Sequence, residues 1–396
     1  MLLTAALIVK NEEKFLGTCL RSLKGLADEV VVVDTGSADR TADIAITEGA
    51  RLYHRPWTGD FSAARNEALN LARGDWILYI DADERVSGGD PELLRAQLRV
   101  ARYIGYRVQL RPRPGFTPYW EMRLFRNHPQ IRFRGIIHEN IWPALNERQA
   151  QSGGRIGHTE LVLDHDGYEG DQGAKHLRNQ PLLEQSLAAD PSRVYSQCHL
   201  ASIREALGDA AGAEQAWGEA MRLVRSKQTR QPEDVLPFLH EIERGLAAAA
   251  DRLEQPDRLG QRGPLELRVP LELRGPLGLL DEALALFPGQ LQLLWLRARA
   301  LIAAGRPAEA AGVLEELVRL GQSGEFDKSW AYDLRLFGVL AYELLAACYF
   351  GEGSYVDALR YFELAAAAEP ANLEYRVKAA LCGRLLATPA ASGART

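Results

Sequence analysis

The sequence predicts two domains of different fold class, an α/β domain followed by an all-α domain of helical repeats. Short β-branched runs alternate with amphipathic helical segments over residues 1 to about 110, which is typical of βαβ units around a mainly parallel, Rossmann-like sheet. After Tyr168 strand signals disappear, and the chain becomes rich in Ala, Leu, Glu and Arg. We therefore expect an α/β domain over residues 1–167 and a helical domain over residues 168–390.

Length and composition agree with two globular domains. The chain has 396 residues, 46% of them hydrophobic, which is enough to build two cores. Its formal net charge of -6 argues against a nucleic-acid or other polyanion partner. No stretch reaches the ~20 uninterrupted apolar residues of a membrane-spanning helix, and the apolar start runs directly into charged residues, so we expect neither a membrane segment nor a signal peptide. Four cysteines without metal-ligand or disulfide spacing favour a cytoplasmic protein.

The α/β domain is predicted to begin with four strands and three helices. The strands are expected at residues 5–9, 30–34, 51–54 and 76–81, and the helices near residues 13–23, 40–48 and 62–72, where apolar residues recur at spacings of three and four. From residue 106 to about 165 the texture changes to Arg, Pro, Gly and aromatic residues. Short extended pieces there, such as 122–125 and 131–137, predict edge strands and loops that complete the site.

The helical domain shows internal self-similarity. Residues 342–370 place large and small residues at the offsets of a 34-residue tetratricopeptide repeat, and two earlier segments repeat the pattern. The positions are Tyr349, Ala358, Phe362, Ala365 and Pro370, then Ala310, Leu314 and Leu317, then Ala213, Trp217 and Ala220. Stacked helical hairpins are expected, interrupted by a segment rich in Pro, Gly and Arg at residues 259–278, whose conformation the sequence does not indicate.

Polar clusters follow three of the predicted strands. Asn11 and Glu12 follow the first, residues 34–37 end the second, and residues 81–84 end the fourth. Ligands of an open α/β sheet bind beyond the carboxyl ends of its strands, so these clusters predict a single site.

The cluster after the fourth strand is the most informative. Acidic side chains directly after a buried strand are costly without a cation, and Mg²⁺ or Mn²⁺ can bridge carboxylates to substrate phosphates. An acidic turn that faces solvent is the alternative for Asp81 and Asp83. Asp34 could likewise be a turn or helix-capping residue, and Arg65 a surface residue of its helix.

These motifs resemble family 2 glycosyltransferases. The resemblance rests on four segments in order: residues 7–12, residues 31–41 with Asp34-Thr35-Gly36-Ser37, residues 61–66 with Arg65-Asn66, and residues 76–84 with Asp81-Ala82-Asp83-Glu84. More narrowly, residues 134–139 and 164–168 resemble a bacterial subgroup with C-terminal tetratricopeptide repeats. The likeness is close to about residue 225 and thereafter only one of repeat class.

The resemblance implies an inverting transferase of GT-A fold that uses a UDP-sugar or similar nucleotide-sugar donor and Mn²⁺ or Mg²⁺. Carried over by position, Asn11, Glu12 and Asp34 would contact the nucleoside, and Asp81 the ribose or the metal. Asp83 would bind the metal, and Arg65 would lie near the donor.

Inverting chemistry needs a carboxylate that deprotonates the acceptor. We predict Glu139 as this base, with Glu84 as the second candidate, although Glu139 could also be a surface carboxylate. The resemblance suggests a histidine in the metal shell, with His165 the first candidate and His138 the alternative; a structural role suits either. Arg123 and Arg126 are expected to project from one strand face toward phosphate, and a solvated edge strand explains them equally well.

The acceptor is the least constrained part of this hypothesis. Stacked helical hairpins present an extended surface that suits a peptide or protein acceptor, and the same surface could mediate homodimerisation. Lipopolysaccharide core is an alternative acceptor. A scaffold with an inactive donor domain, or a nucleotidyltransferase, are alternatives of another class, but the acidic motifs are intact and no Gly-rich loop follows the first strand.

Overall fold

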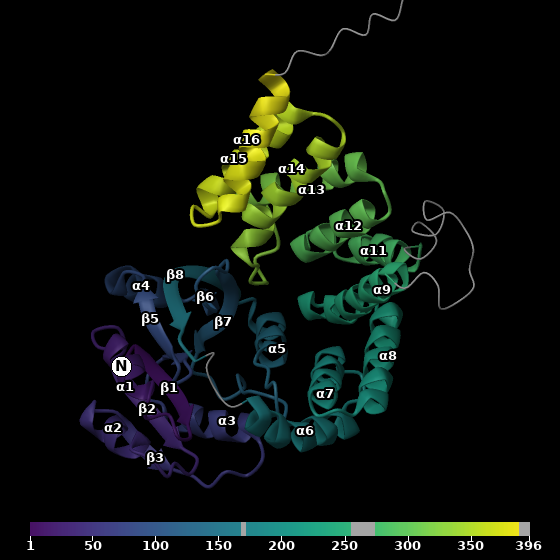
Figure 1. Ribbon diagram of the computed structural model, residues 1–396. Coiled ribbons are helices and arrows are strands. Elements are labelled where there is room, and N and C mark those ends of the chain that lie inside the picture. Colours follow the sequence, from purple (N-terminus) through teal and green to yellow (C-terminus); the bar gives the residue numbers. More distant parts are fainter. Residues whose placement is uncertain (168–171, 255–273, 388–396) are drawn as a thin grey trace, which may run out of the picture. The chain divides into compact units, whose positions relative to one another are not determined.

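The computed structural model describes residues 1–167, 172–254 and 274–387, and the chain divides into two compact units (Figure 1). Unit 1 comprises Met1–Arg230 with Lys328–Ala331, and unit 2 comprises Gln231–Asp327 with Tyr332–Thr396. Each unit is described by itself.

Unit 1 contains an eight-stranded mixed sheet in the order β3-β2-β1-β4-β7-β6-β8-β5. The strands are β1 Leu3–Val9, β2 Glu29–Asp34, β3 Arg51–His54, β4 Trp76–Tyr79, β5 Glu84–Gly88, β6 Tyr103–Arg111, β7 Tyr119–Arg126 and β8 Arg155–His165. The four strands predicted first, β1 to β4, are present and pair in parallel. The added half contains antiparallel pairs, β4 with β7, β7 with β6 and β5 with β8, so the sheet is mixed.

Helices pack on both faces of this sheet. They are α1 Leu16–Ser22, α2 Thr41–Thr47, α3 Phe61–Leu71, α4 Pro91–Leu98 and α5 Trp142–Ser152. One core cluster joins the sheet to α1 and α4 through residues such as Leu16 and Leu98. The other joins it to α3 and α5 through Leu69 and Leu145. Alternate strand residues feed each cluster, which fixes the register of the buried strands because a shift by one residue would exchange the two faces.

The prediction of an extended piece at residues 131–137 is wrong as far as strand pairing is concerned. The structure has only an isolated bridge between Arg134 and Asn140 there. Instead of a neighbouring strand, the side chain of Asn66 satisfies Phe133, donating to its carbonyl at 2.9 Å and accepting from its amide at 2.8 Å. The amide and carbonyl of Phe133 are thus hydrogen-bonded by a side chain of α3 and not by a strand. Residues 134–140 form a loop.

Three further helices belong to unit 1: α6 Gln172–Ala189, α7 Val194–Ala206 and α8 Ala210–Ser226. Consecutive members pack together, and the predicted repeat residues Ala213, Trp217 and Ala220 are buried in α8. The sequence-based boundary at residue 167 marks where the strands end. Contacts group these three helices with the sheet in unit 1. The domain boundary at residue 167 therefore stays a prediction.

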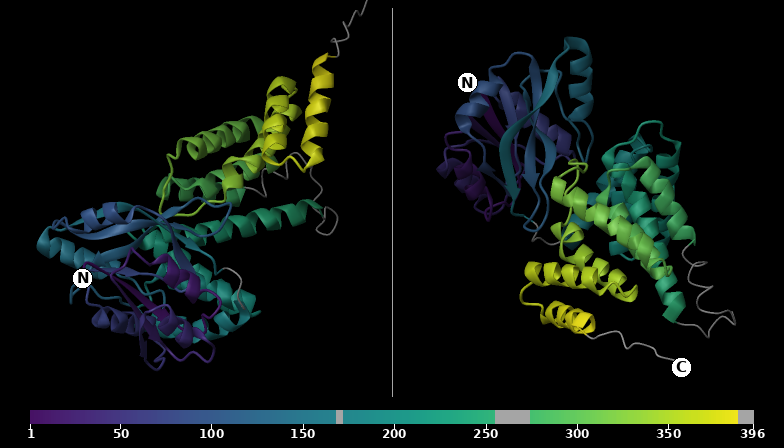
Figure 2. Two further views of the ribbon diagram at one scale, coloured as in Figure 1. Left: turned by 90° about the vertical axis from the view of Figure 1, so that its left-hand side faces the viewer. Right: turned by 90° about the horizontal axis from the view of Figure 1, so that it is seen from above.

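Unit 2 is helical in the residues described. It contains the 3-10 helix η1 Pro232–Val235, α9 Leu236–Glu254, α11 Arg274–Leu286, α12 Leu291–Ala303, α13 Pro307–Ser323, the 3-10 helix η2 Leu334–Phe337, α14 Val339–Gly351, α15 Tyr355–Ala368 and α16 Leu373–Ala387. Its green-to-yellow helices follow one another as packed hairpins (Figure 2). Ala310, Leu314 and Leu317 of α13, and Ala358, Phe362 and Ala365 of α15, are buried, which confirms the predicted repeat pattern.

Two details of unit 2 bear on the sequence predictions. Most of the interruption predicted at residues 259–278 lies outside the described residues, and its last part, from residue 274, is helical. One segment, Leu334–Gly351, has the length and mean hydropathy, 1.4, of a membrane span. Its helix α14 contacts α13 and α15, and a third of the segment is buried.

Candidate functional site

The polar clusters predicted at three strand ends all lie at the carboxyl edge of the parallel strands. Asn11 and Glu12 follow β1, Asp34 ends β2, and residues 81–83 connect β4 to β5. Because β2, β1 and β4 are neighbours in the sheet, their carboxyl ends converge. The acidic groups of Glu12, Asp81 and Asp83 are near enough to interact electrostatically.

Asp34 and Asn11 build the turn beside this edge. Asp34 Oδ1 accepts hydrogen bonds from the amides of Gly36 at 3.1 Å and Ser37 at 2.9 Å. Asn11 Oδ1 accepts from the amide of Ala38 at 2.8 Å, and the Asn11 amide donates to Ser37 Oγ at 2.9 Å. Asp34 is buried, and its carboxylate stabilises this turn. The nucleoside contact predicted for Asn11 and Asp34 remains a prediction.

Asp81 is held by two arginines from different elements. Arg65 Nη2 of α3 lies 2.8 Å from Asp81 Oδ1, and Arg123 Nη1 of β7 lies 3.4 Å from Asp81 Oδ2. Burial alone would raise the pKa of Asp81, but the two guanidinium groups outweigh it and hold the pKa well below its usual range. The ring of Tyr79 lies under both arginines, 5.0 Å from Arg65 Cζ and 4.5 Å from Arg123 Cζ. These contacts fix both cations beside the acidic cluster.

Glu84 does not suit the base role for which it was the second candidate. Its side chain is 2% exposed, Oε1 accepts from Arg123 Nη2 at 2.7 Å, and Oε2 accepts from the Asp81 amide at 2.9 Å. Burial raises the pKa of Glu84 to about 7, against the opposing effect of Arg123. A carboxylate with both oxygens occupied inside the protein cannot reach an acceptor, so Glu84 supports the site from beneath.

The expectation that Arg123 and Arg126 share one strand face is wrong. The pairing of β7 with β6 shifts between Leu124 and Met122, so Arg123 lies at an irregularity of the strand. Arg123 is buried in the site, whereas Arg126 stacks over Trp76, 4.2 Å from its ring centroid, on the other face of the sheet. Arg123 was also predicted to contact donor phosphate, but in this structure its Nη atoms bind Glu84 and Asp81.

Asp83 and His165 form a pair at the open side of the cluster. His165 Nε2 lies 3.1 Å from Asp83 Oδ2, and the two side chains are 24% and 26% exposed. At 3.1 Å the two groups are within hydrogen-bond distance, and two ligands at right angles around an ion about 2.1 Å away would have a similar spacing of about 3.0 Å. Within the described residues no group of three His, Cys, Asp or Glu side chains is arranged to hold a metal.

Gly167 is a site residue that the sequence reading did not single out. A Cβ atom at this position would lie 2.1 Å from Asp83 Oδ2, so only glycine lets the chain pass so close to that carboxylate. The amide of Asp166, one residue earlier, donates to the Asp83 carbonyl at 2.8 Å. A glycine two residues after a candidate metal-binding histidine was the available signal.

Glu139 and Arg65 form an ion pair across the site. Arg65 Nε donates to Glu139 Oε1, so one guanidinium connects Glu139 to Asp81. His138, the alternative metal ligand, is turned away: its ring packs on Tyr195 and His199 of α7, with centroids 4.9 and 4.3 Å distant. Of the two histidines, the structure brings His165 to the acidic residues.

Two non-glycine residues of the described chain have positive φ, Asn11 at 57° and His138 at 51°. Each directly precedes a candidate site residue, Glu12 or Glu139. Such backbone costs roughly 1 kcal/mol or more and persists where surrounding contacts hold it, as at functional sites. Backbone strain thus coincides with the acidic cluster on two sides.

The excess of acidic groups is the main electrostatic feature of the site. Burial, together with the charges of Asp83 and Asp81, raises the pKa of Glu12 to about 7. The pKa of Glu84 is raised to a similar value. A divalent cation at this edge would lower the cost of keeping these carboxylates ionised, which is the usual arrangement for binding a diphosphate.

An open α/β sheet with carboxylates and two arginines at its carboxyl edge agrees with the fold class predicted from the sequence. Comparison with known families agrees, because residues 4–150 match the model of glycosyl transferase family 2. The match to this family is confined to residues 4–150, within the sheet-containing unit.

Two curated relatives cover more of the chain. A TPR repeat-containing protein of Synechococcus elongatus is 36% identical over 257 residues, 63% of this chain and 64% of that protein. The lipopolysaccharide core biosynthesis glycosyltransferase LpsC of Rhizobium meliloti is 36% identical over 179 residues, 41% of this chain and 65% of LpsC. The chain thus spans less than two thirds of either relative.

Among solved structures, glucosyl-3-phosphoglycerate synthase of Mycobacterium tuberculosis in complex with Mn²⁺ and UDP-glucose is similar to part of this chain. The identity is 19%, the match covers 47% of this chain and 78% of the synthase, and the TM-score is 0.35. A likeness at this level describes a distant neighbour and carries no residue assignment.

Proposed function

We propose that the protein is a metal-dependent, inverting glycosyltransferase that moves a sugar from a nucleotide-sugar, most simply a UDP-sugar, to a peptide or protein acceptor. The observation that carries the proposal is the constellation at the carboxyl edge of the sheet. The Asp83 and His165 pair lies on its open side, and Arg65 joins Asp81 to Glu139. The family 2 match gives this arrangement its reaction class.

In this proposal Asp83 Oδ2 and His165 Nε2 would hold Mn²⁺ or Mg²⁺, whose positive charge would favour departure of the diphosphate. Asp81 stays ionised because Arg65 and Arg123 hold it, so it can accept a ribose hydroxyl or serve the metal. Asn11, Glu12 and Asp34 line the nucleoside side of the edge. Arg65 lies beside the donor and supports the charge that develops on its phosphates.

Glu139 acts as the general base. Its side chain is 11% exposed, which leaves an edge that an acceptor can reach, and Arg65 fixes its orientation. Glu139 takes the proton of the acceptor nucleophile while that atom bonds to the anomeric carbon, and the bond from this carbon to the diphosphate oxygen breaks on the opposite side. Attack opposite to the leaving group inverts the anomeric centre.

A peptide or protein acceptor is supported by the helical hairpins, because stacked repeats present an extended surface for a chain-like partner. The same kind of surface could instead pair two copies of the protein. Lipopolysaccharide core is the second candidate acceptor. It is favoured by the 36% identity to LpsC.

The test is a donor screen with the full chain. Incubation with several nucleotide-sugars and Mn²⁺ or Mg²⁺, and measurement of nucleoside diphosphate release, should identify a donor whose turnover the metal stimulates. Absence of metal-stimulated turnover with every donor would contradict the proposal. Candidate peptides and lipopolysaccharide core are then added separately, and the acceptor is the one that gains mass by one sugar.

Substitution of the base separates binding from transfer. Glu139→Gln keeps the shape of the side chain and should lower turnover by about 10²- to 10⁴-fold, the usual contribution of a general base. Donor binding, measured by calorimetry with the metal present, should change little. A Glu139→Gln variant of full activity would remove Glu139 from the base role.

A further inference from the structure

The loop that carries Glu139 is held by helices on two sides. Its ends are closed by hydrogen bonds between the backbones of Arg134 and Asn140, at 2.8 and 3.0 Å. On one side the amide of Phe61, the first residue of α3, donates to the Ile136 carbonyl at 2.8 Å. On the other side the loop contacts α6, α7 and Arg193 between them.

Arg193, the residue before α7, makes the polar part of that contact. Its Nη2 donates to the His138 carbonyl at 2.9 Å, and its Nη1 donates to Ser186 Oγ of α6 at 3.2 Å. A Cβ atom at Gly135 would lie 2.9 Å from Arg193 Nη1, so the glycine leaves room for the guanidinium. One side chain therefore connects the loop to both helices of the hairpin.

Apolar and ring contacts from the hairpin complete the support. Ile137 is 3% exposed and belongs to a core cluster with four leucine and isoleucine side chains of α6 and α7: Leu183, Leu187, Leu200 and Ile203. The ring of His138 lies against Tyr195 and His199. Burial lowers the pKa of His138 to about 3 and that of His199 to about 4, so both rings pack as neutral groups.

These contacts concern the three residues that precede Glu139. The carbonyl of Ile136, the side chain of Ile137 and the carbonyl of His138 are each fixed by a different neighbour, and His138 has the strained φ of 51°. A strained residue keeps its conformation only when its surroundings determine it. Of these neighbours, Arg193 is the one whose charged hydrogen bond acts directly on the strained residue.

We propose that Arg193 is a positioning residue for the reaction: it holds the loop of residues 134–140 so that Glu139 reaches Arg65 and the acceptor. The hairpin of α6 and α7 is then part of the catalytic unit, and repeats available for other partners begin beyond it. This inference rests on the proposed function for the role of Glu139. The holding of the loop itself can be measured without turnover.

Arg193→Met removes both hydrogen bonds and keeps a long side chain. Since misplacement by about 1 Å can cost 10²-fold in rate, we expect kcat to fall by roughly 10- to 100-fold while the donor KM stays within about threefold. Arg204→Met is the matched control. Arg204 lies in α7 and, like Arg193, bonds a carbonyl and a side chain, Gly212 O and Glu184, but not the loop. Arg193→Lys, with fewer donors, should show a smaller loss if Arg193→Met does not fold.

A double-mutant cycle distinguishes positioning from a general structural role. In the Glu139→Gln background, Arg193→Met should cause little further loss, because the group that it positions is already inactive. An additive loss, or a loss equal to that of Arg204→Met, would overturn the inference.

Amide hydrogen exchange gives a readout that does not depend on activity. The amides of Arg134 and Asn140, bonded to each other's carbonyls, should exchange about tenfold faster in Arg193→Met, while amides of β1 and β4 stay unchanged. Unchanged exchange of the loop would overturn the inference. If the wild type transfers no sugar but the loop exchanges faster, the proposed function fails and the holding of the loop by Arg193 stands.

Discussion

The amino and carboxyl edges of the parallel strands each contain a buried glutamate beside an arginine. The pKa values of these two glutamates are shifted in opposite directions. Glu29 starts β2 at the amino edge, and Glu84 starts β5 beside the carboxyl edge. Each side chain is 2% exposed, and each is bonded to an arginine, Arg51 or Arg123. The pKa of Glu29 is lowered, whereas that of Glu84 is raised to about 7.

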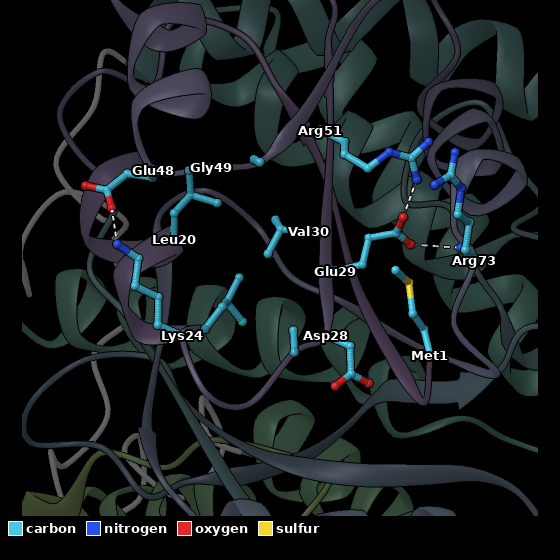
Figure 3. Close-up of a pocket in the computed structure, with 13 residues that line it drawn as sticks. Met1, Leu20, Lys24, Asp28, Glu29, Val30, Glu48, Gly49, Arg51 and Arg73 are labelled. Atoms are coloured by element: carbon cyan, nitrogen blue, oxygen red, sulfur yellow. Dashed lines mark hydrogen bonds and ion pairs between the residues drawn. The ribbon is translucent and has the colours of Figure 1, made fainter.

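The difference arises from the neighbours. Burial raises the pKa of Glu29, but Thr4 Oγ1 at 2.7 Å, the Arg73 amide at 2.8 Å and Arg51 all donate to it and outweigh that effect. Figure 3 shows this carboxylate between the two arginines, in a pocket of about 300 Å³ at the amino edge. Burial raises the pKa of Glu84 too, and there the charge of Asp81 adds to it.

At the amino edge, hydrogen-bond donors match the buried carboxylate of Glu29, as expected of a region selected only for stability of the fold. The carboxyl edge gathers more carboxylates than its arginines neutralise, which lowers stability unless a cation is bound. A pocket by itself is therefore a weak sign of function in this protein. The pocket in Figure 3 lies at the amino edge, where donors match the buried carboxylate. The excess negative charge lies at the carboxyl edge, where the motifs that resemble family 2 glycosyltransferases are found.

The largest expected effect is that of Asp83→Ala at the carboxyl edge. If Asp83 and His165 are the metal ligands proposed above, loss of Asp83 should lower metal-stimulated turnover by about 10³-fold or more, since a metal ion contributes several kcal/mol to a transition state. Melting temperature should change little, because Asp83 also repels Glu12. Turnover assays across a manganese titration measure the effect. Unchanged activity would show that Asp83 does not serve the metal.

The opposite result is expected for Glu29→Gln at the amino edge. The new amide group would face donors from Thr4 and Arg73, so the free energy of unfolding should fall by about 2 to 3 kcal/mol, as measured by urea denaturation. Turnover per folded molecule should stay at the wild-type value. Glu48→Gln in the same pocket is the control, because Glu48 meets only exposed Lys24 and Arg21 and should matter little. A loss of activity by Glu29→Gln without unfolding would end the distinction between the edges.

Much of this comparison could be predicted from the sequence, and the reasons differ by residue. Strands β1 and β2 contain β-branched runs and β4 is a short apolar run, so the sequence predicts that the residues at their carboxyl ends lie at one edge. Asp83 and His165 are 82 positions apart in sequence, and only resemblance suggested that they meet.

The remainder depends on tertiary contacts that leave little local trace. Residues 131–137 alternate apolar and polar residues like a strand, yet Asn66 takes the place of a strand partner. Arg65 and Glu139 were each named, but their pairing across 74 positions was not predicted. Arg193 lies in the predicted helical domain, and its contact with the His138 carbonyl joins segments that the sequence assigned to different domains.

The smallest expected effect is a pH dependence that sharpens the contrast between the two glutamates. A carboxyl whose folded pKa is raised to about 7 contributes stability that is full below its unfolded pKa near 4.5 and is lost as pH rises through 7. Wild-type protein should therefore lose about 1 to 3 kcal/mol between pH 5 and pH 8 through Glu84, and Glu84→Gln, which cannot ionise, should not. Urea denaturation of both proteins at the two pH values, without divalent metal, gives the difference, and Glu12 titrates equally in both. The stability of wild type relative to Glu84→Gln should fall with rising pH. A constant difference would mean that Glu84 keeps one protonation state over this range, and that the two edges of the sheet differ less than their contacts indicate.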